Sequence, residues 1–368
     1  MIPSRIANVR DRLAEEGLDG LLVLIEENRK YLSGFTGEDH HFDESCGALL
    51  ITSDSLILAT DSRFELQARN EAPDYEVVIY RNGLSKELPG LTQRLNVRKL
   101  GFESARLSVQ QHAALQKAYE DENQPLTLVP VEDLVERFRQ IKTAEEIALT
   151  RQALALAEMA FRSVVSNLKP GMTEKQVAWA MESAMRESGA DGLCFPVIVA
   201  GGPNSALPHA VPSERPIRTG EPILFDWGAK LNGYCSDTSR TIILGAADDT
   251  FKKVHGTVLE AQQRAIAAIK AGANSKAVDA AARDFIHQNG YEGKFGHGLG
   301  HGTGLAVHEA PRLSPLRETI LESGMLVTVE PGIYLPEWGG VRIENQVVVG
   351  DDGPIVLNTL PTHYSTTN

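Results

Sequence analysis

The chain has 368 residues, of which 42% are hydrophobic and 23% charged, with a formal net charge of −13 and a pI of about 5.3. This length suggests about two domains, and the composition excludes wholesale disorder, collagen and a single coiled coil. The negative charge disfavours broad binding to nucleic acid or anionic membranes, because both need a basic face. No segment approaches the roughly 20 apolar residues of a transmembrane helix. The N-terminus also lacks the basic start and apolar core of a secretory signal.

The chain contains three cysteines, Cys46, Cys194 and Cys235, which lie far apart in the sequence. This pattern fits neither a disulfide framework nor a thiolate zinc site, and it is typical of a reducing compartment. We therefore expect a cytoplasmic protein that binds neither nucleic acid nor membranes.

Residues 1–130 alternate between helical and strand patterns, which predicts an α/β domain. Ser4 is placed to cap a first helix. Ser53-Asp54 separates two apolar runs, so a hairpin is expected there. The other expected elements are strands at 21–25 and 75–80 and helices at 63–71 and 109–119.

A second pattern begins at residue 131, and we expect residues 131–368 to form the other domain. Thr143 with Glu146, and Thr173 with Gln176, have the S/T-x-x-E/Q spacing that is typical of a helix N-terminus. Further helices are predicted at 249–271 and 275–289, and strands are expected between and after them.

Two strand–turn–strand segments, residues 222–244 and 325–349, each carry a pair of acids. In the first, Asp226 and Asp237 flank Asn232-Gly233, which is a strong hairpin signal. A four-residue loop would place the two acids directly opposite each other, whereas a two-residue turn would make them diagonal neighbours. Both registers put the acids on one face of the sheet, where like charges repel unless something neutralises them.

In the second segment, Glu330 ends one apolar strand and Glu344 lies inside another. Their even separation places both acids on one face if the loop has an odd length, such as 335–339. A buried carboxylate must be paired, protonated or bound to metal. Arg240 and Arg342 are the only basic residues placed to help.

Four acids call for about four positive charges, which two divalent cations would supply. Oxygen-rich coordination favours hard cations, and one imidazole among the ligands shifts the choice toward Mn²⁺, Fe²⁺, Co²⁺ or Zn²⁺. The alternative is that the acids are solvated on the outer face of a sheet. We favour metal because two such hairpins occur in one chain, each flanked by apolar runs.

Residues 294–311 contain His297, His301 and His308, with glycine at every second position from 296 to 304. Glycines at this density let the backbone approach a site closely. The segment matches neither a dinucleotide-binding fingerprint nor a Walker loop. A flexible loop with incidental metal affinity is the alternative.

A further histidine, His209, lies in a loop rich in Gly, Pro and Ser before the first hairpin.

In chain order, the motifs LPHA, FDWG, SDTSR, GHGLGHGTGLAVHE, TVEPGIY and VRIEN resemble those of the pita-bread metallopeptidases, specifically the Xaa-Pro dipeptidase (prolidase) and aminopeptidase P branch. The resemblance extends from residue 139 to about residue 349, and residues 1–130 resemble the creatinase-type N-terminal domain of that branch. It implies an α/β protein in which a creatinase-like domain precedes a pita-bread domain, whose curved antiparallel sheet is covered by helices.

The resemblance implies two divalent metal ions, with Mn²⁺ favoured over Co²⁺, Zn²⁺ and Fe²⁺. Asp226 would hold one metal, His301 and Glu330 would hold the other, and Asp237 and Glu344 would bridge both. None of these five residues is substituted. This argues against creatinase, which shares the fold without using metal, and against non-catalytic pita-bread proteins that have lost ligands.

The implied reaction is metal-dependent hydrolysis of the Xaa-Pro bond at the N-terminus of dipeptides or short peptides. Two metals can hold a bridging water and lower its pKa, and the resulting hydroxide would attack the scissile carbonyl. Glu330 is the candidate for proton transfer to the leaving nitrogen. His308 and His209 match the substrate-side histidines of the family, which bind the carbonyl or stabilise the oxyanion. The matched supporting positions are His297, Tyr334 and Arg342, of which the last could pair with a ligand carboxylate.

The resemblance also implies a homodimer, in which a loop from the partner's N-terminal domain lies over the active site. Residues 36–45, which include His40 and His41, are our hypothesis for that loop, with a solvated surface turn as the alternative. A cationic group that closes the far side of the proline pocket would select dipeptides, but the sequence does not locate one. Two other functions stay open: dimetal hydrolysis of a phosphoester or another C–N bond, and a non-catalytic peptide-binding module.

Overall fold

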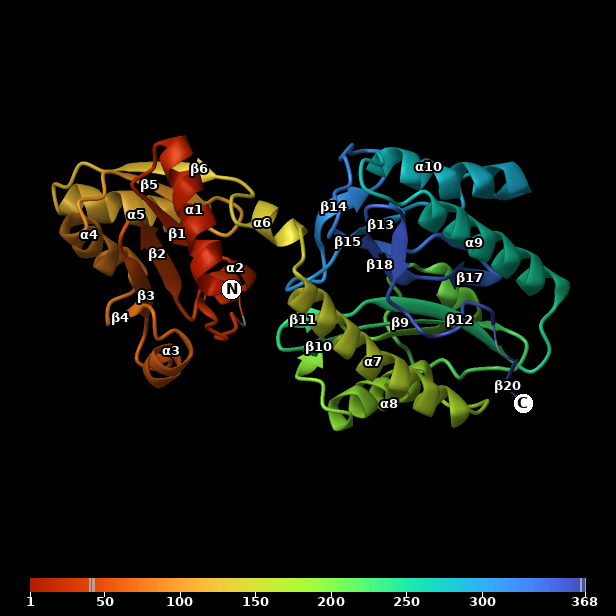
Figure 1. Cartoon of the computed structure of the whole chain (residues 1–368). Coiled ribbons are helices and arrows are strands. Elements are labelled where there is room, and N and C mark those ends of the chain that lie inside the picture. Colours follow the sequence, from red (N-terminus) through yellow and green to blue (C-terminus); the bar gives the residue numbers. More distant parts are fainter. Residues whose placement is uncertain (40, 42–43, 365, 368) are drawn as a thin grey trace. The chain divides into compact units, whose positions relative to one another are not determined.

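The structure, a computed structural model, describes residues 1–39, 41, 44–364 and 366–367. His40, one of the two histidines in the loop hypothesis, lies outside the described residues. Contacts within the chain divide it into two units, Met1–Phe138 and Arg139–Asn368 (Figure 1). The division thus falls after Phe138, whereas the sequence boundary was set at residue 130. Among the described residues, no helix combines the length and hydropathy needed to cross a bilayer.

The first unit contains a six-stranded sheet with the strand order β4-β3-β2-β1-β5-β6. Strands β1, β5 and β6 are parallel, β3 and β4 are parallel, and β2 is antiparallel to both of its neighbours. The pairing of β2 with β3 confirms the predicted hairpin. Leucines of α4 and α5 pack with residues of the sheet in one core. The elements are α1 (Ile2–Glu16), β1 (Gly20–Val23), α2 (Glu26–Ser33), β2 (Ala48–Thr52), β3 (Leu56–Thr60), α3 (Glu65–Glu71), β4 (Glu76–Ile79), α4 (Leu84–Arg94), β5 (Lys99–Glu103), α5 (Val109–Asp121), β6 (Thr127–Val131) and α6 (Glu136–Gln140), which crosses the division.

Helix α1 begins earlier than the sequence predicts. Met1 is its N-cap residue, and the Ser4 hydroxyl donates a hydrogen bond to the Met1 carbonyl instead of accepting one from a backbone N–H. The expectation that Ser4 caps this helix is therefore wrong. Pro3 is well suited to the first turn, because the N–H that it lacks would have no partner there.

The second unit places antiparallel strands between two pairs of helices (Figure 1). Helices α7 and α8 pack on the sheet β20-β12-β9-β8, and helices α9 and α10 pack on the sheet β14-β13-β15-β18-β19 and its neighbours. This arrangement confirms the expected fold class. The elements are α7 (Ala144–Ser166), α8 (Glu174–Glu187), β7 (Gly192–Leu193), β8 (Ile198–Gly201), η1 (Gly202–Ala206), β9 (Pro222–Trp227), β10 (Ala229–Leu231), β11 (Tyr234–Cys235), β12 (Thr238–Leu244), α9 (Asp249–Ala267), α10 (Ser275–Ile286), η2 (His287–Tyr291), β13 (Gly300–Gly302), β14 (Glu309–Leu313), β15 (Leu326–Val329), β16 (Gly332–Leu335), β17 (Gly339–Arg342), β18 (Asn345–Val349), β19 (Pro354–Val356) and β20 (Thr366–Thr367).

Both predicted capping boxes are present in this unit. The Thr143 hydroxyl accepts a hydrogen bond from the Glu146 N–H, and the Glu146 carboxylate accepts one from the Thr143 N–H. Thr173 and Gln176 form the same reciprocal pair at the start of α8. Each box satisfies two backbone donors that the helix itself leaves free.

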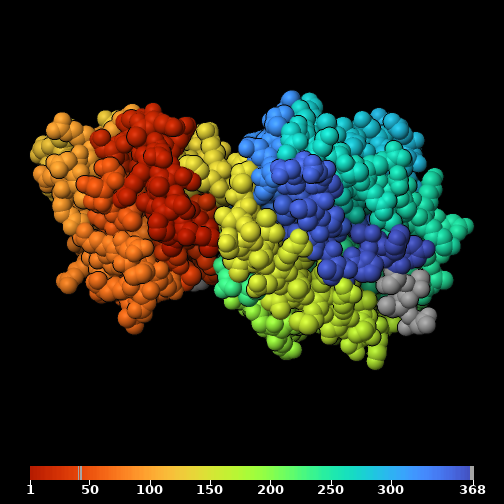
Figure 2. Space-filling view, in the orientation of Figure 1, coloured from red at the N-terminus to blue at the C-terminus, as the bar shows by residue number. Residues whose placement is uncertain are grey.

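The segment around Thr359 packs on α7, and Figure 2 shows blue C-terminal residues beside yellow ones. The Glu158 carboxylate of α7 accepts hydrogen bonds from the backbone N–H groups of Thr359 and Leu360. Arg240 of β12 donates to the carbonyl groups of Leu360 and Pro361. The C-terminal segment therefore fastens α7 to the strand that follows Asp237.

Candidate metal centre

The first acid-bearing hairpin has a two-residue turn. Asp226 lies opposite Ser239, and Lys230 lies opposite Cys235, so the register leaves Asn232-Gly233 as the turn. Both turn residues have positive φ, 51° and 85°, as a type I′ turn requires. Of the two registers considered from the sequence, the structure has the one in which Asp226 and Asp237 are diagonal neighbours.

The loop of the second hairpin has an odd length, which the even separation of Glu330 and Glu344 requires if both acids are to lie on one face. Leu335 lies opposite Gly339, which leaves the three residues 336–338 between β16 and β17. The pairs Val329–Asn345 and Gly332–Arg342 have the same register. Glu330 therefore lies level with Glu344 on the same face of the strands.

The alternating glycines let the histidine segment fit between two strands. A Cβ on Gly300 would collide with the carbonyl oxygen of Thr328, and a Cβ on Gly302 would collide with that of Ala310. Only glycine allows this approach. As a result, His301 in β13 lies between β14 and β15 and faces the acids.

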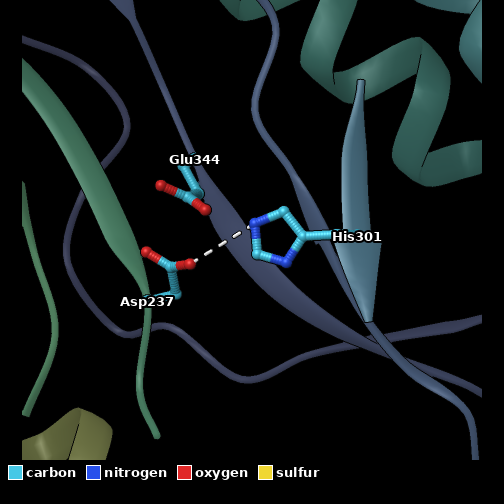
Figure 3. A group of neighbouring side chains, drawn as sticks. All are labelled: Asp237, His301 and Glu344. Atoms are coloured by element: carbon cyan, nitrogen blue, oxygen red, sulfur yellow. Dashed lines mark ion pairs between the residues drawn. The ribbon is translucent and has the colours of Figure 1, made fainter. Parts of the chain in front are cut away.

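Figure 3 shows Asp237, His301 and Glu344 pointing toward one another from three separate strands or strand ends. One ligand atom from each of these residues lies within 4.8 Å of those of the other two, and all three side chains are buried. His301 Nε2 is 3.6 Å from Asp237 Oδ2 and 3.3 Å from Glu330 Oε1. This is the arrangement that a divalent cation with oxygen and nitrogen ligands needs.

Asp226 is held at the edge of this group by Arg342. Arg342 Nη2 donates to Asp226 Oδ2 at 2.6 Å, and the same guanidinium donates to the Tyr334 hydroxyl and to Ser239 Oγ. His297 Nε2 lies 2.8 Å from the Tyr334 hydroxyl and so extends this chain. The other oxygen of Asp226, Oδ1, is buried and has no hydrogen-bond partner within the described chain.

The Ser239 hydroxyl joins two members of the centre, because it accepts from Arg342 Nε and donates to Glu344 Oε2 at 2.7 Å. Thr328 Oγ1 has a similar place: it accepts from the His301 N–H at 3.0 Å and donates to Glu330 Oε1 at 3.3 Å. Neither residue was among the candidates predicted from the sequence. Ser239 follows Asp237 by two residues and Thr328 precedes Glu330 by two, so the period of the strand was a usable signal.

Without a cation, the negative charges of these acids repel one another. Burial raises the pKa of Asp237 well above its ordinary value, and the charges of Glu344, Asp226 and Glu330 raise it further. Burial also raises the pKa of Glu344, as do the charges of Glu330 and Asp226. Burial also acts to raise the pKa of Glu330, but the hydrogen bond and charge of His301, together with the charges of His297 and Arg342, lower that pKa to about 2. Such shifts are typical of a site built to hold positive charge.

The donor set fits divalent metal. It offers two buried carboxylates, Asp237 and Glu344, two partly buried ones, Asp226 and Glu330, and one imidazole. Among the described residues, only Arg342 is a direct cationic partner for these acids. A hard or borderline divalent ion prefers such ligands.

A cavity of about 800 Å³ opens above the acids. The ring of His308 lies in its wall, 4.3 Å from the ring of His301. Burial and the charge of His301 lower the pKa of His308 to about 4, which favours its neutral form. Most of the predicted site residues line the cavity: Asp226, Asp237, His301, Glu330, Glu344, His209, His297, His308 and Arg342.

The structure therefore brings together candidate residues from six separate sequence motifs. Of the predicted site residues, Tyr334 alone does not line the cavity. It is buried and is hydrogen-bonded to Arg342 and His297. The cavity wall also contains two cationic residues that were not predicted from the sequence, Arg312 and Arg317. Arg312 lies opposite His301 in the β13–β14 pairing, a position that no motif in the sequence reveals.

With this geometry established, comparison with known families identifies the class of protein. Residues 148–351 match metallopeptidase family M24, and residues 5–141 match the creatinase/prolidase N-terminal domain. The chain belongs to metallopeptidase family M24, with a creatinase-type N-terminal domain, and it is a metallopeptidase.

Individual relatives cover nearly the whole chain. An uncharacterised peptidase of Bacillus subtilis is 38% identical over 357 residues, which are 97% of this chain and 98% of that protein. The solved structure of an Xaa-Pro dipeptidase from Bacillus anthracis has a TM-score of 0.93 at 39% identity, with both chains fully covered. That of an X-Pro aminopeptidase from Thermotoga maritima has a TM-score of 0.87 at 37% identity, covering 97% of this chain and 100% of that one.

Proposed function

We propose that this metallopeptidase hydrolyses the Xaa-Pro bond of dipeptides with the help of two divalent cations, Mn²⁺ in the first place. Asp226 would hold one cation, His301 and Glu330 the other, and Asp237 and Glu344 both. The observation that carries the proposal is the convergence of four acids, two buried and two partly buried, and one imidazole on a single cavity. When bound, two such cations supply the charge that lowers the pKa of water and polarises a carbonyl.

The side chains around the acids have separate tasks in this proposal. Glu330 would carry a proton from the attacking water to the leaving proline nitrogen, because its carboxylate lies at the cavity floor. His308 and His209, on the cavity wall, would donate hydrogen bonds to the carbonyl oxygen and stabilise its developing charge. Arg342 would orient Asp226 and oppose the rise that burial causes in its pKa, and Tyr334 and His297 would hold Arg342 in turn.

Arg312 and Arg317 support a dipeptide as the substrate. Both line the cavity together with the apolar residues Val307 and Leu316. A proline ring needs an apolar pocket, and a dipeptide presents its terminal carboxylate immediately beyond that ring. A guanidinium is suited to binding such a carboxylate through two parallel hydrogen bonds. We therefore assign Arg312 and Arg317 to this carboxylate. The homodimer, the cytoplasmic location and the role of residues 36–45 stay predictions.

The test is a metal and substrate titration of the purified protein. We expect bound divalent metal on isolation, loss of Ala-Pro hydrolysis after chelation, and recovery on addition of Mn²⁺ or Co²⁺. The dipeptide Ala-Pro is expected to be cleaved faster than the tripeptide Ala-Pro-Ala.

Two results would contradict the proposal. Near-zero metal with no hydrolysis after addition of Mn²⁺ or Co²⁺ would favour a peptide-binding module. Faster turnover of a phosphotriester than of Ala-Pro would favour a dimetal hydrolase of another substrate.

A further inference from the structure

We propose that Glu309 is a positioning residue for His308 and that two buried cations, Arg139 and Lys142, fix it in place. The inference rests on the proposed function, in which His308 faces the substrate carbonyl. It gives a task to the first residues of the second unit, which lie more than 160 positions before Glu309 in the sequence.

Both oxygens of the Glu309 carboxylate are held. Lys142 Nζ lies 2.9 Å from Oε2, and Arg139 Nη2 pairs with Oε1. The three side chains are only 2–7% exposed. Oε1 also accepts a hydrogen bond from the backbone N–H of Ala306 at 3.0 Å. The carboxylate therefore ties the start of the second unit to the loop that precedes His308.

This loop is shaped around the ion network. A Cβ on Gly304 would come within 3.0 Å of both Glu309 oxygens and 3.1 Å of Lys142 Cε. The Gly304 carbonyl accepts a hydrogen bond from the Cys235 N–H at 2.8 Å, two residues before Asp237. The loop, the network and the first acid-bearing hairpin are thus packed as one piece.

The His308 ring depends on this backbone for its position. Within the described residues, the ring contacts the ring of His301 and makes no hydrogen bond of its own. Its side chain is therefore directed by the loop before it and by Glu309 after it. A shift of the Glu309 carboxylate would move the His308 ring relative to His301.

Lys142→Met is the variant that separates positioning from folding. Glu309→Gln would leave two buried cations without their carboxylate, which is strongly destabilising. Lys142→Met keeps the Arg139–Glu309 pair and frees only Oε2. Glu158→Gln is a matched control, because Glu158 is also a buried carboxylate of the second unit but holds Thr359 and Leu360 rather than the His308 loop.

The experiment is a double-mutant cycle on kcat/KM for Ala-Pro in the Mn²⁺-loaded enzyme. We expect Lys142→Met to lower kcat/KM about tenfold in the wild-type background and by no more than about twofold in the His308→Ala background. Glu158→Gln should lower it by less than about twofold in both. An equal loss from Lys142→Met in both backgrounds, or no loss in either, would overturn the inference.

Crystal structures of the wild type and Lys142→Met give a test that needs no activity. The centroids of the His301 and His308 rings are 4.3 Å apart in the wild-type chain. We expect this separation to be larger in Lys142→Met. An unchanged separation would overturn the inference. A wild-type enzyme that does not cleave Ala-Pro would instead contradict the proposed function, and the crystallographic comparison would still test the positioning role.

Discussion

Asp237 lies where the charges of Asp226, Glu330 and Glu344 act together. Asp237→Asn removes the Asp237 charge and with it one proposed bridging ligand, so we expect hydrolysis of Ala-Pro to fall at least about a thousandfold. The metal-free variant should remain folded, because the substitution relieves repulsion between buried acids. Glu344→Gln should behave in the same way. The measurements are turnover at saturating Mn²⁺ and the circular dichroism spectrum.

A matched control is Asp248→Asn, since Asp248 caps α9 and accepts from the Phe251 N–H. Asparagine caps a helix about as well as aspartate, so this variant should keep its activity. Near-wild-type turnover of Asp237→Asn or Glu344→Gln at saturating Mn²⁺ would refute the assignment of the bridging ligands.

Arg312 gives a second prediction at the scale of single residues. Arg312→Met keeps most of the length of the side chain but cannot bind a carboxylate. We expect KM for Ala-Pro to rise about tenfold or more, because hydrogen bonds to a charged group contribute roughly 1.5–3 kcal/mol. KM for the amidated dipeptide, which has no carboxylate, should change little. Equal increases for both substrates would show that Arg312 does not recognise the terminal charge.

At this scale, sequence reasoning found residues whose chemistry is conspicuous and missed those that depend on register. Four acids in two hairpins and three histidines among glycines could be proposed from type and spacing. Arg312 could not, because its place opposite His301 follows from a strand pairing that includes a β-bulge. The partners of Glu309 are still further from any local pattern, since Arg139 and Lys142 come from the start of the unit.

Strand β13 leads to a prediction at the scale of one element. Gly300→Ala places a Cβ against the Thr328 carbonyl oxygen and must push β13 away from β15. We expect a loss of stability of about 2 kcal/mol or more and weaker metal binding, because packed interiors accommodate added atoms poorly. Urea unfolding and calorimetric titration with Mn²⁺ measure the two effects.

Gly296→Ala is the matched control from the same run of glycines. A Cβ on Gly296 meets nothing within 4 Å, so both stability and metal affinity should change little. If Gly296→Ala and Gly300→Ala had the same effect, close approach would not explain the alternating glycines.

The elements themselves were largely predictable where local chemistry sets them. The two capping boxes and the Asn232-Gly233 turn are local signals, and the structure confirms them. The start of α1 was predicted wrongly, because Ser4 has the capping chemistry but Pro3 sets the first turn. The choice between two registers of the first hairpin also needed the structure, since both keep the acids on one face.

The two units should respond separately to metal. All three tryptophans, Trp179, Trp227 and Trp338, lie in the second unit, so their fluorescence reports on that unit alone. Each bound Mn²⁺ ion, at a hundredfold excess over its Kd, should stabilise the second unit by about 2.7 kcal/mol. The midpoint of denaturant unfolding followed by tryptophan fluorescence should shift to a higher denaturant concentration when Mn²⁺ is added. The midpoint of the circular dichroism transition that arises from the first unit should not shift. A shift in both signals would place a metal site in the first unit as well.

The first unit has a pH dependence of its own through Glu103. Burial and the charge of Glu136 raise the pKa of Glu103, whereas hydrogen bonds from the Ile25 and Leu24 N–H groups oppose the rise. The net result is a pKa of about 7. A folded-state pKa above the unfolded value means that the folded unit holds its proton more tightly. Its contribution to stability is therefore full below about pH 4.5 and is lost as the pH rises through about 7.

We expect the free energy of unfolding of the first unit to decline across this range, and Glu103→Gln to flatten the decline. Urea unfolding followed by circular dichroism at several pH values measures it. An equal decline in Glu103→Gln would assign the pH dependence to another group.

At the scale of the whole molecule, the number of domains and their classes followed from length and pattern, whereas the division between them did not. Strand β6 ends at Val131, but the first unit continues to Phe138. The short helix α6 (Glu136–Gln140) crosses the division by contacts, so a boundary set where the sequence pattern changes does not coincide with it.

The spacing of the acids along the chain has a consequence for biosynthesis. A ribosome releases residues in order, and the proposed ligands extend from Asp226 to Glu344, so the set is incomplete until Glu344 has emerged. A shortened product that stops before this glutamate would lack a proposed ligand of both ions and should retain them poorly.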